Sequence, residues 1–202
     1  MISPPNDKEG EIEKVQACFD MGLNCFHLRK PSWSVKEYEA YIANFSTSDQ
    51  KKIHVHSLLP DKEALGGIHL PERIWRELSE TDFQRLREEA DANKQTLSVS
   101  LHALSNAGNA MIYSDYAFLS PVYDSISKTE YRASSSVWND IKHLKPTHTK
   151  IIALGGVRMG NYASLKEAGF DGVAVLGAFW ELNLQEQDMD LFWKKATQLF
   201  AK

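Results

Sequence analysis

Cysteine is scarce in this sequence of 202 residues, which contains only Cys18 and Cys25. The six residues between them match no spacing that metal-binding or redox motifs use. We expect both to be buried free thiols in a reducing compartment. The sequence therefore argues against a small disulfide-stabilised secreted protein.

Long apolar runs and basic stripes are also missing. No apolar stretch approaches the roughly 18–20 residues that span a bilayer, and the opening segment MISPPNDKEGEIEK has no apolar core of a secretory signal. The net charge of −4, with its basic residues scattered, argues against a nucleic-acid surface. We therefore expect a cytoplasmic protein that binds neither membranes nor nucleic acids.

Short apolar runs alternate with helical patterns along almost the whole chain. The runs lie at 24–28, 53–55, 67–70, 97–101, 116–119, 150–154 and 172–176, with helical periodicity at 12–21, 35–45, 75–92, 105–113, 137–144, 162–168 and 189–200. The start, ISPP, is interpreted as the remnant of a first strand, which brings the count to eight. Repeated β-then-α order predicts a parallel sheet, and no GxGxxG follows the first strand. We predict one domain over residues 1–202, a single α/β domain with a (β/α)8 TIM-barrel fold.

Two glycine-containing turns follow the last two predicted strands. They are Leu154-Gly155-Gly156-Val157 and Val175-Leu176-Gly177-Ala178. In barrels, the loops after strands seven and eight form a recurrent phosphate site, because glycine lets backbone N–H groups approach the oxygens. We predict that Gly155, Gly156, Leu176 and Gly177 bind a phosphate; the alternative is that the glycines only permit tight turns.

The stretch SPVYDSISKTEY follows the predicted strand at 116–119 and carries hydroxyls and one ammonium. Ser125 and Ser127 alternate across Ile126, and Lys128 follows at once. Hydroxyl donors and a positive charge suit a phosphate or pyrophosphate, which offers many acceptors. The alternative is a solvated loop.

Five of the seven histidines fall on predicted strands or at their ends: His27, His54, His56, His69 and His102. Near the carboxyl ends of the strands, His102 is a candidate general acid/base and Arg29 a candidate ligand for a carboxylate or phosphate. One alternative is that the histidines are hydrogen-bonded core residues. Another is a metal site made of His54, His56 and a neighbour. No carboxylate partner accompanies the H-x-H pattern, so we predict no metal site.

In this order, the segments FHLRK, GIHL, SVSLHA, SDYAFLSPVYDSISK, KIIALGGV and AGFDGVAVLGAFW resemble the thiamine phosphate synthase/TenI superfamily. They span about residues 22–180, and the family is built on a (β/α)8 barrel. The resemblance implies a reaction in which a pyrimidine diphosphate and a thiazole phosphate are joined, pyrophosphate leaves and Mg²⁺ assists. It places pyrophosphate at Arg29, Ser125, Ser127 and Lys128, the thiazole phosphate at Gly156, Leu176 and Gly177, and the synthase serine at Ser100.

The sequence departs from the synthase pattern where the metal would bind. The synthase Asn-Asp pair is replaced by His56-Ser57, a second metal-binding aspartate by Ile74, and a lysine by Pro31, with Lys30 as a possible substitute. Loss of both carboxylates should raise the barrier to pyrophosphate departure. The TenI branch also lacks this metal site, and His102 stands at the position of its catalytic histidine. We keep His56 as a substrate-binding candidate.

The leading hypothesis is a metal-independent, TenI-type thiazole tautomerase that acts on thiazole phosphate carboxylate and needs no cofactor. A second hypothesis is a divergent thiamine phosphate synthase that uses Mg²⁺ and also binds the pyrimidine diphosphate. A third is a non-catalytic regulatory or carrier protein for thiazole or thiamine phosphates. Phe192, Trp193 and Phe200 in the last helix are expected either to form a homo-oligomer interface or to pack on the barrel.

Overall fold

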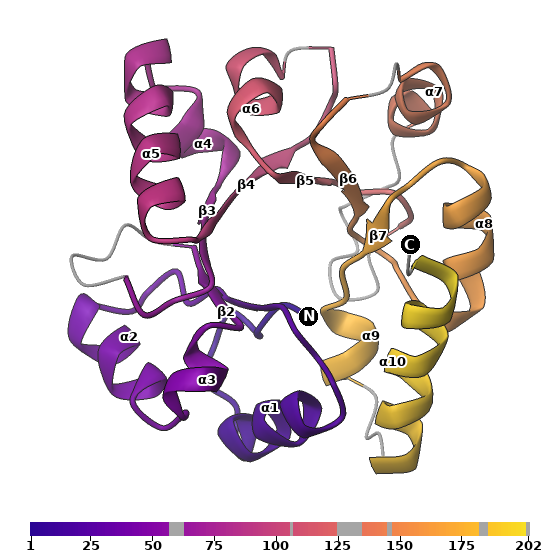
Figure 1. The fold of residues 1–202 in the computed structure, drawn as a ribbon. Helices are drawn as coiled ribbons and strands as arrows, with labels where there is room; N and C mark the ends of the chain where they lie inside the picture. Colours follow the sequence, from indigo (N-terminus) through magenta and orange to yellow (C-terminus); the bar gives the residue numbers. More distant parts are fainter. Residues whose placement is uncertain (57–62, 106, 125–134, 145–146, 182–185, 201–202) are drawn as a thin grey trace.

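The computed structural model describes residues 1–56, 63–105, 107–124, 135–144, 147–181 and 186–200. Each of its strands pairs in parallel with the next one along the chain, in the order β1 to β7. The strands are β1 (Phe26–Leu28), β2 (Ile53–Val55), β3 (Gly67–Leu70), β4 (Thr96–Leu101), β5 (Tyr116–Leu119), β6 (Lys150–Ala153) and β7 (Gly172–Val173). Figure 1 shows the sheet curling around a central axis, with the helices outside it. The predicted α/β class is confirmed.

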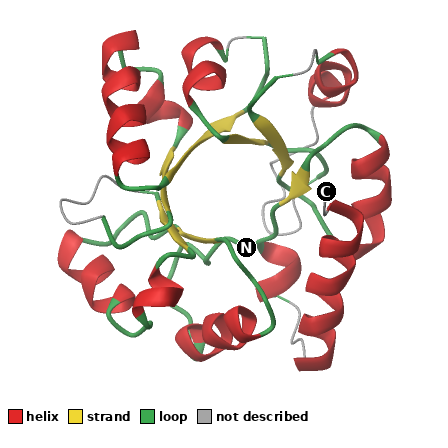
Figure 2. Cartoon of the chain, in the orientation of Figure 1, coloured by secondary structure: helices red, strands yellow, loops and turns green. Residues whose placement is uncertain are grey.

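Helices cover the outer face of the curled sheet (Figure 2). They are α1 (Glu11–Asp20), α2 (Val35–Ile42), α3 (Thr47–Gln50), α4 (Glu72–Trp75), α5 (Glu80–Ala92), α6 (Gly108–Tyr113), α7 (Ser135–His143), α8 (Tyr162–Glu167), α9 (Gly177–Trp180) and α10 (Glu186–Phe200), with a 3₁₀ turn at Met159–Asn161. Ser34 and Ser79 cap α2 and α5 through reciprocal bonds with Glu37 and Asp82, which satisfy free N–H groups at the helix starts. Among the described residues, no helix is both long and apolar enough to cross a bilayer.

The predicted first strand, ISPP, forms only an isolated bridge. Ile2 pairs in parallel with His27, and its N–H donates to the carbonyl of Val175 at 3.0 Å. The segment therefore lies between the end of β7 and β1, but Pro4 and Pro5 follow it. Proline fixes φ and has no N–H to donate, so the ladder stops there. The described residues thus form a seven-stranded curled parallel sheet, and the complete eight-stranded barrel of the prediction is not confirmed.

The two faces of the sheet differ in character because side chains alternate along each strand. The outer face is apolar and packs on the helices, with residues such as Phe26, Val55 and Leu97 fully buried. The inner face is apolar near β5 to β7, where Ile2, Phe118 and Ala174 form a small separate cluster.

The remainder of the inner face, on β1 to β4, carries the polar side chains of the interior. His27, His69 and Ser98 are almost completely buried there. Buried polar groups are stable only when they are hydrogen-bonded, so we expect the side chains in this half of the interior to form a hydrogen-bond network.

The aromatic residues of α10 pack on the body of the protein. Phe192 is 1% exposed and contacts Tyr162 and Phe179, while Trp193 and Phe200 are partly buried against the main core. Packing accounts for these residues; the predicted homo-oligomer stays a prediction.

Candidate active site at the carboxyl ends of the strands

A cavity of about 850 Å³ opens where the strands end. It is lined by the following predicted site residues: Arg29, His56, Ser100, His102, Gly155, Gly156, Leu176 and Gly177. They come from five different strand ends, those of β1, β2, β4, β6 and β7, brought together because parallel strands all finish at the same edge of the sheet. The other three predicted residues, Ser125, Ser127 and Lys128, lie outside the described residues. The roles assigned to these side chains remain predictions.

His102 follows β4 and is held by the carboxylate of Glu72, the first residue of α4. The backbone N–H of His102 donates to Oε2 of Glu72 at 3.1 Å, and the imidazole Nδ1 contacts the same oxygen. Since Nδ1 is engaged, Nε2 is the ring nitrogen left for a ligand. The His102 side chain is 54% exposed, whereas that of Glu72 is 14% exposed. The imidazole of His102 is therefore accessible and is oriented by a largely buried carboxylate.

Glu72 remains ionised in this arrangement. Burial acts to raise its pKa, but hydrogen bonds from His102 and Arg76 outweigh burial and lower the pKa below its ordinary value. The guanidinium Nε of Arg76 donates to Oε1 at 2.7 Å, one turn along the helix. The structure thus binds Glu72 to the candidate catalytic histidine, a contact that the sequence analysis did not predict.

The loop after β6 has a backbone that only glycine adopts readily. Gly155 and Gly156 have φ of 93° and 63°, in the left-handed region. A Cβ at Gly156 would lie 2.5 Å from the carbonyl oxygen of Asp124 and from Cβ of Tyr123. The carbonyl of Gly155 accepts a bond of 3.1 Å from the N–H of Tyr123. The loops after β5 and β6 are therefore packed directly against each other at the cavity wall.

Several backbone N–H groups at the last two strand ends have no acceptor among the described residues. In the described part of the chain, no acceptor is found for the N–H groups of Gly156, Val157, Gly177 or Ala178. All four residues line the cavity. Unpaired N–H groups at a cavity wall attract an anion with several acceptor oxygens, such as a phosphate.

The two basic residues after β1 are placed differently. Lys30 is buried, and its Nζ lies 2.7 Å from Oε2 of Glu11, in an ion pair whose side chains are 0% and 4% exposed. Its charge is therefore taken up by Glu11, which argues against Lys30 as the substitute for the lysine missing at Pro31. The guanidinium of Arg29 has no ion-pair partner within the described ranges. Of these two residues, Arg29 is the one whose charge remains for an anionic ligand.

His56 and Ser100 lie in the floor of the cavity and are tied to the buried network below it. Nε2 of His56 lies 3.0 Å from Nδ1 of His27, and Oγ of Ser100 lies 2.7 Å from Nε2 of His69. Burial, together with the charges of His69 and Arg29, holds the pKa of His56 well below its usual range. His56 is therefore a neutral imidazole at pH 7, able to donate or accept a hydrogen bond.

Among the described residues, the donor set of the cavity does not fit Mg²⁺, which prefers several carboxylate and water oxygens. The described lining contains the carboxylates of Glu72 and Glu181. Glu72 is engaged by His102 and Arg76, and Ile74 stands in α4 where the synthase pattern has a carboxylate. Groups of three potential metal ligands do occur in the described residues, but both lie in the buried histidine network.

Comparison with known proteins places the chain in a family. The profile of the thiamine monophosphate synthase family (TMP-TENI) matches residues 1–179. A thiamine-phosphate synthase from Listeria welshimeri is 31% identical over 91 residues, which is 43% of this chain and 43% of that protein. The aligned region thus spans less than half the length of this relative.

Solved structures support the fold over nearly the full length. A thiamine phosphate pyrophosphorylase from Bacteroides thetaiotaomicron has a TM-score of 0.69 and 24% identity, and covers 98% of this chain and 94% of its own. One from Pyrococcus furiosus has a TM-score of 0.75 and 16% identity, covering 99% and 95%. With the profile match over residues 1–179, these comparisons show that the chain belongs to the thiamine monophosphate synthase (TMP-TENI) family.

Proposed function

We propose that this chain is an enzyme of thiamine biosynthesis that shifts a proton on a thiazole phosphate carboxylate, without a metal ion. One observation carries the proposal: the accessible imidazole of His102 is held by the ionised carboxylate of Glu72 at the cavity wall. Family membership supports the pathway. The unsuitability of the described lining for Mg²⁺ favours the proton shift over the transfer reaction.

The proposed reaction needs one group that both accepts and donates a proton. A proton leaves one position of the conjugated heterocycle, the bonding electrons move through the ring, and a proton is delivered to a second position. No atom is lost and no oxidant or reductant is required. Nε2 of His102 accepts the first proton, and the resulting imidazolium returns it.

Glu72 makes His102 suitable for this role. Its carboxylate accepts a hydrogen bond from Nδ1–H, and this tautomer leaves the lone pair of the cavity-lining imidazole on Nε2. When the imidazole becomes an imidazolium, the adjacent negative charge stabilises it. Glu72 is therefore a positioning residue that acts through His102.

The remaining lining supplies an anchor for each end of the substrate. The unpaired N–H groups of Gly156, Val157, Gly177 and Ala178 suit the phosphate. Arg29 suits the substrate carboxylate, because a guanidinium forms two parallel hydrogen bonds with a carboxylate. With both ends fixed, the heterocycle lies between them and within reach of His102.

The proposal is tested by turnover of the non-aromatic thiazole phosphate carboxylate in the presence of EDTA. We expect conversion to the aromatic tautomer at a rate well above the uncatalysed one, unchanged by added Mg²⁺. Absence of conversion, or a strict requirement for Mg²⁺, would contradict it.

A second candidate is thiamine-phosphate synthase activity itself. It is favoured by the matched family profile and by the synthase from Listeria welshimeri. Ser125, Ser127 and Lys128 are retained in the sequence, and a reaction with a single phosphate does not obviously need them. Incubation with the pyrimidine diphosphate, the thiazole phosphate and Mg²⁺ separates the candidates, because only the synthase releases pyrophosphate.

A further inference from the structure

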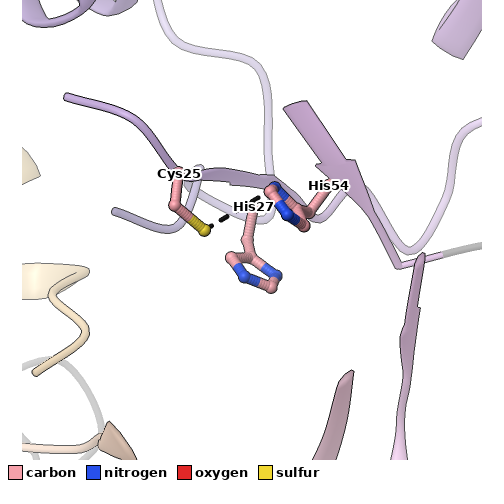
Figure 3. Close-up of side chains that lie close together, drawn as sticks. All are labelled: Cys25, His27 and His54. Atoms are coloured by element: carbon pink, nitrogen blue, oxygen red, sulfur yellow. Dashed lines mark hydrogen bonds between the residues drawn. The ribbon is translucent and has the colours of Figure 1, made fainter. Parts of the chain in front are cut away.

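A second group of reactive side chains lies inside the sheet, away from the cavity. Cys25 precedes β1, His27 lies in β1, and His54 lies opposite His27 in β2 (Figure 3). None of the three lines the cavity. One ligand atom of each lies within 4.8 Å of the others. The proposed reaction makes no use of this group.

The separation of the sulfur and nitrogen atoms matches that of two ligands on one tetrahedral ion. Sγ of Cys25 and Nδ1 of His54 are 3.6 Å apart, and Figure 3 shows them facing each other. In a tetrahedral zinc site with Zn–S of about 2.3 Å and Zn–N of about 2.0–2.1 Å, these two atoms lie about 3.5–3.6 Å apart. The Cys25–His54 pair therefore needs little movement to bind such an ion.

The second nitrogen of His54 has the partner that metal-bound histidines usually have. Nε2 of His54 lies 2.9 Å from Oγ1 of Thr96. That hydroxyl can donate to the carbonyl of Gly66 at 3.5 Å, which leaves its oxygen to accept Nε2–H. In this tautomer the lone pair of His54 is on Nδ1, 3.6 Å from Sγ of Cys25. Nδ1 also lies 3.3 Å from the carbonyl oxygen of Lys52, to which the opposite tautomer would donate, so an ion at Nδ1 replaces that contact. Such outer hydrogen bonds fix the ring orientation of metal-binding histidines.

His27 is oriented in a similar way. Its Nδ1 lies 3.0 Å from Nε2 of His56, and its Nε2 lies 2.7 Å from the hydroxyl of Tyr116. If Nδ1–H donates to His56, the lone pair of His27 is on Nε2. The Tyr116 hydroxyl also lies 3.7 Å from Sγ of Cys25. When an ion binds Nε2 of His27 in place of this hydroxyl, the hydroxyl can donate to the sulfur instead.

Space for the His54 ring is created by two glycines at the start of β3. A Cβ at Gly67 would lie 2.5 Å from Cδ2 of His54, and one at Gly66 would lie 3.1 Å from Cε1. His27 and His54 are 1% and 5% exposed, while Cys25 is partly exposed. An ion can therefore reach the group from the side of Cys25.

Another triad of histidines is less suited to bind an ion. His27, His56 and His69 also bring ligand atoms within 4.8 Å of one another. Both ring nitrogens of His69 are bonded to serines, Nδ1 to Ser98 at 3.0 Å and Nε2 to Ser100 at 2.7 Å, and unlike the first group this triad offers no thiolate. The two histidines of the H-x-H pattern, His54 and His56, also bond different partners: His56 contacts His27, and His54 contacts Cys25.

From these contacts we infer that Cys25, His27 and His54 form a three-ligand site for a transition-metal ion of the Zn²⁺ type. A thiolate and two imidazoles suit such an ion and not Mg²⁺ or Ca²⁺, which prefer oxygen ligands. A fourth position is left for water. The site connects β1 to β2 and is separate from the candidate active site, so its test does not depend on the proposed function.

The test uses Co²⁺ as a spectroscopic probe on the untagged, EDTA-treated full chain. We expect one equivalent to produce the visible bands of tetrahedral cobalt and a near-ultraviolet thiolate-to-cobalt band, both lost when Zn²⁺ is added. Cys25→Ser should remove the thiolate band, and His54→Gln should weaken binding at least about 10-fold. Cys18→Ser, at the other cysteine, is the matched control and should retain both bands.

A measurement on the unmodified protein covers the case in which a variant fails to fold. Zn²⁺ should protect Cys25 from alkylation by a maleimide, with the modified residue identified by peptide mass mapping. The inference is overturned if no thiolate band forms, if Cys25→Ser binds Co²⁺ like the parent chain, or if Cys25 is alkylated equally fast with and without Zn²⁺.

Discussion

The carboxylate of Glu72 bonds both the backbone N–H and the imidazole Nδ1 of His102, across the ends of two neighbouring strands. Glu72 opens α4 directly after β3, and His102 follows β4. The same oxygen therefore fixes the position of the chain and the orientation of the ring. This contact gives the candidate active site its acid/base character, and each part of it can be varied separately.

Substitution Glu72→Gln should reduce turnover of the thiazole tautomer by roughly 10–10³-fold, since an amide cannot fix the tautomer or stabilise the imidazolium. The dissociation constant for thiazole phosphate should change little, because the phosphate is predicted to bind at the glycine turns after β6 and β7 and not at Glu72. Steady-state kinetics across pH 5–9 and calorimetric binding check both values.

The matched control for this change is Glu181→Gln, which also alters a carboxylate of the cavity lining. It should leave the rate close to that of the parent chain. If both variants lose the same activity, the positioning role of Glu72 is wrong.

Substitution Gly156→Ala should weaken binding of a phosphate ester and destabilise the fold by about 1–3 kcal/mol. The new methyl group would meet Asp124 and Tyr123 at 2.5 Å, on a backbone with φ of 63°. Gly160→Ala is the control, because Gly160 has no neighbouring atom within 4 Å of a Cβ. Chemical denaturation and phosphate-ester titration measure the two effects; equal behaviour of the two variants would refute the role of the loop.

Removing one member of the buried ion pair should be costly. Lys30→Met leaves the carboxylate of Glu11 buried without its cation, which typically costs about 3–5 kcal/mol of unfolding free energy. The double variant Lys30→Met/Glu11→Leu should recover much of that loss. Urea unfolding of the single and double variants measures the coupling, and additive losses would show that the pair is not coupled.

The buried histidines predict a fold that is sensitive to acid. Burial, with the charges of His54 and Arg29, lowers the pKa of His69 to about 3, whereas an unfolded histidine has a pKa of about 6.5. As pH falls from 6.5 towards 3, the unfolded chain binds a proton that folded His69 does not bind. The free energy of unfolding should therefore fall through this window, by at most roughly 1.4 kcal/mol per pH unit for this residue. Above about pH 6.5, His69 should add no pH dependence to the stability.

Unfolding free energies in EDTA at several pH values between 7.5 and 4.5 test this prediction. His69→Gln cannot bind the proton, so its stability should change less steeply with pH than that of the parent chain. Identical slopes would mean that His69 is already protonated in the folded state.

Much of the architecture could be predicted because buried parallel strands have a simple pattern. The apolar runs at 67–70 and 116–119 coincide with β3 and β5, and the other runs overlap the remaining strands. The exception is the N-terminal strand, where two prolines leave a bridge at Ile2. Strand β7 (Gly172–Val173) is also shorter than predicted, although the N–H of Ala174 still donates to the carbonyl of Ala153 at 2.8 Å.

The candidate site could be predicted as a set of strand ends but not as a set of contacts. Knowing that His102 and Gly156 end strands is enough to place them at one edge of a parallel sheet. The pairing of Glu72 with His102 depends on the register of β3 and β4, in which His69 lies opposite Ser98. Periodicity does not specify register or the direction of a side chain beyond the strand, so this contact needed the structure.

The most direct test of the proposed function compares turnover and binding in His102→Ala. Conversion of the thiazole tautomer should fall by at least about 10²-fold, while the affinity for thiazole phosphate should stay within about threefold of the parent chain. An unchanged rate, or an equal loss of binding and turnover, would contradict the assignment of His102 as the group that moves the proton.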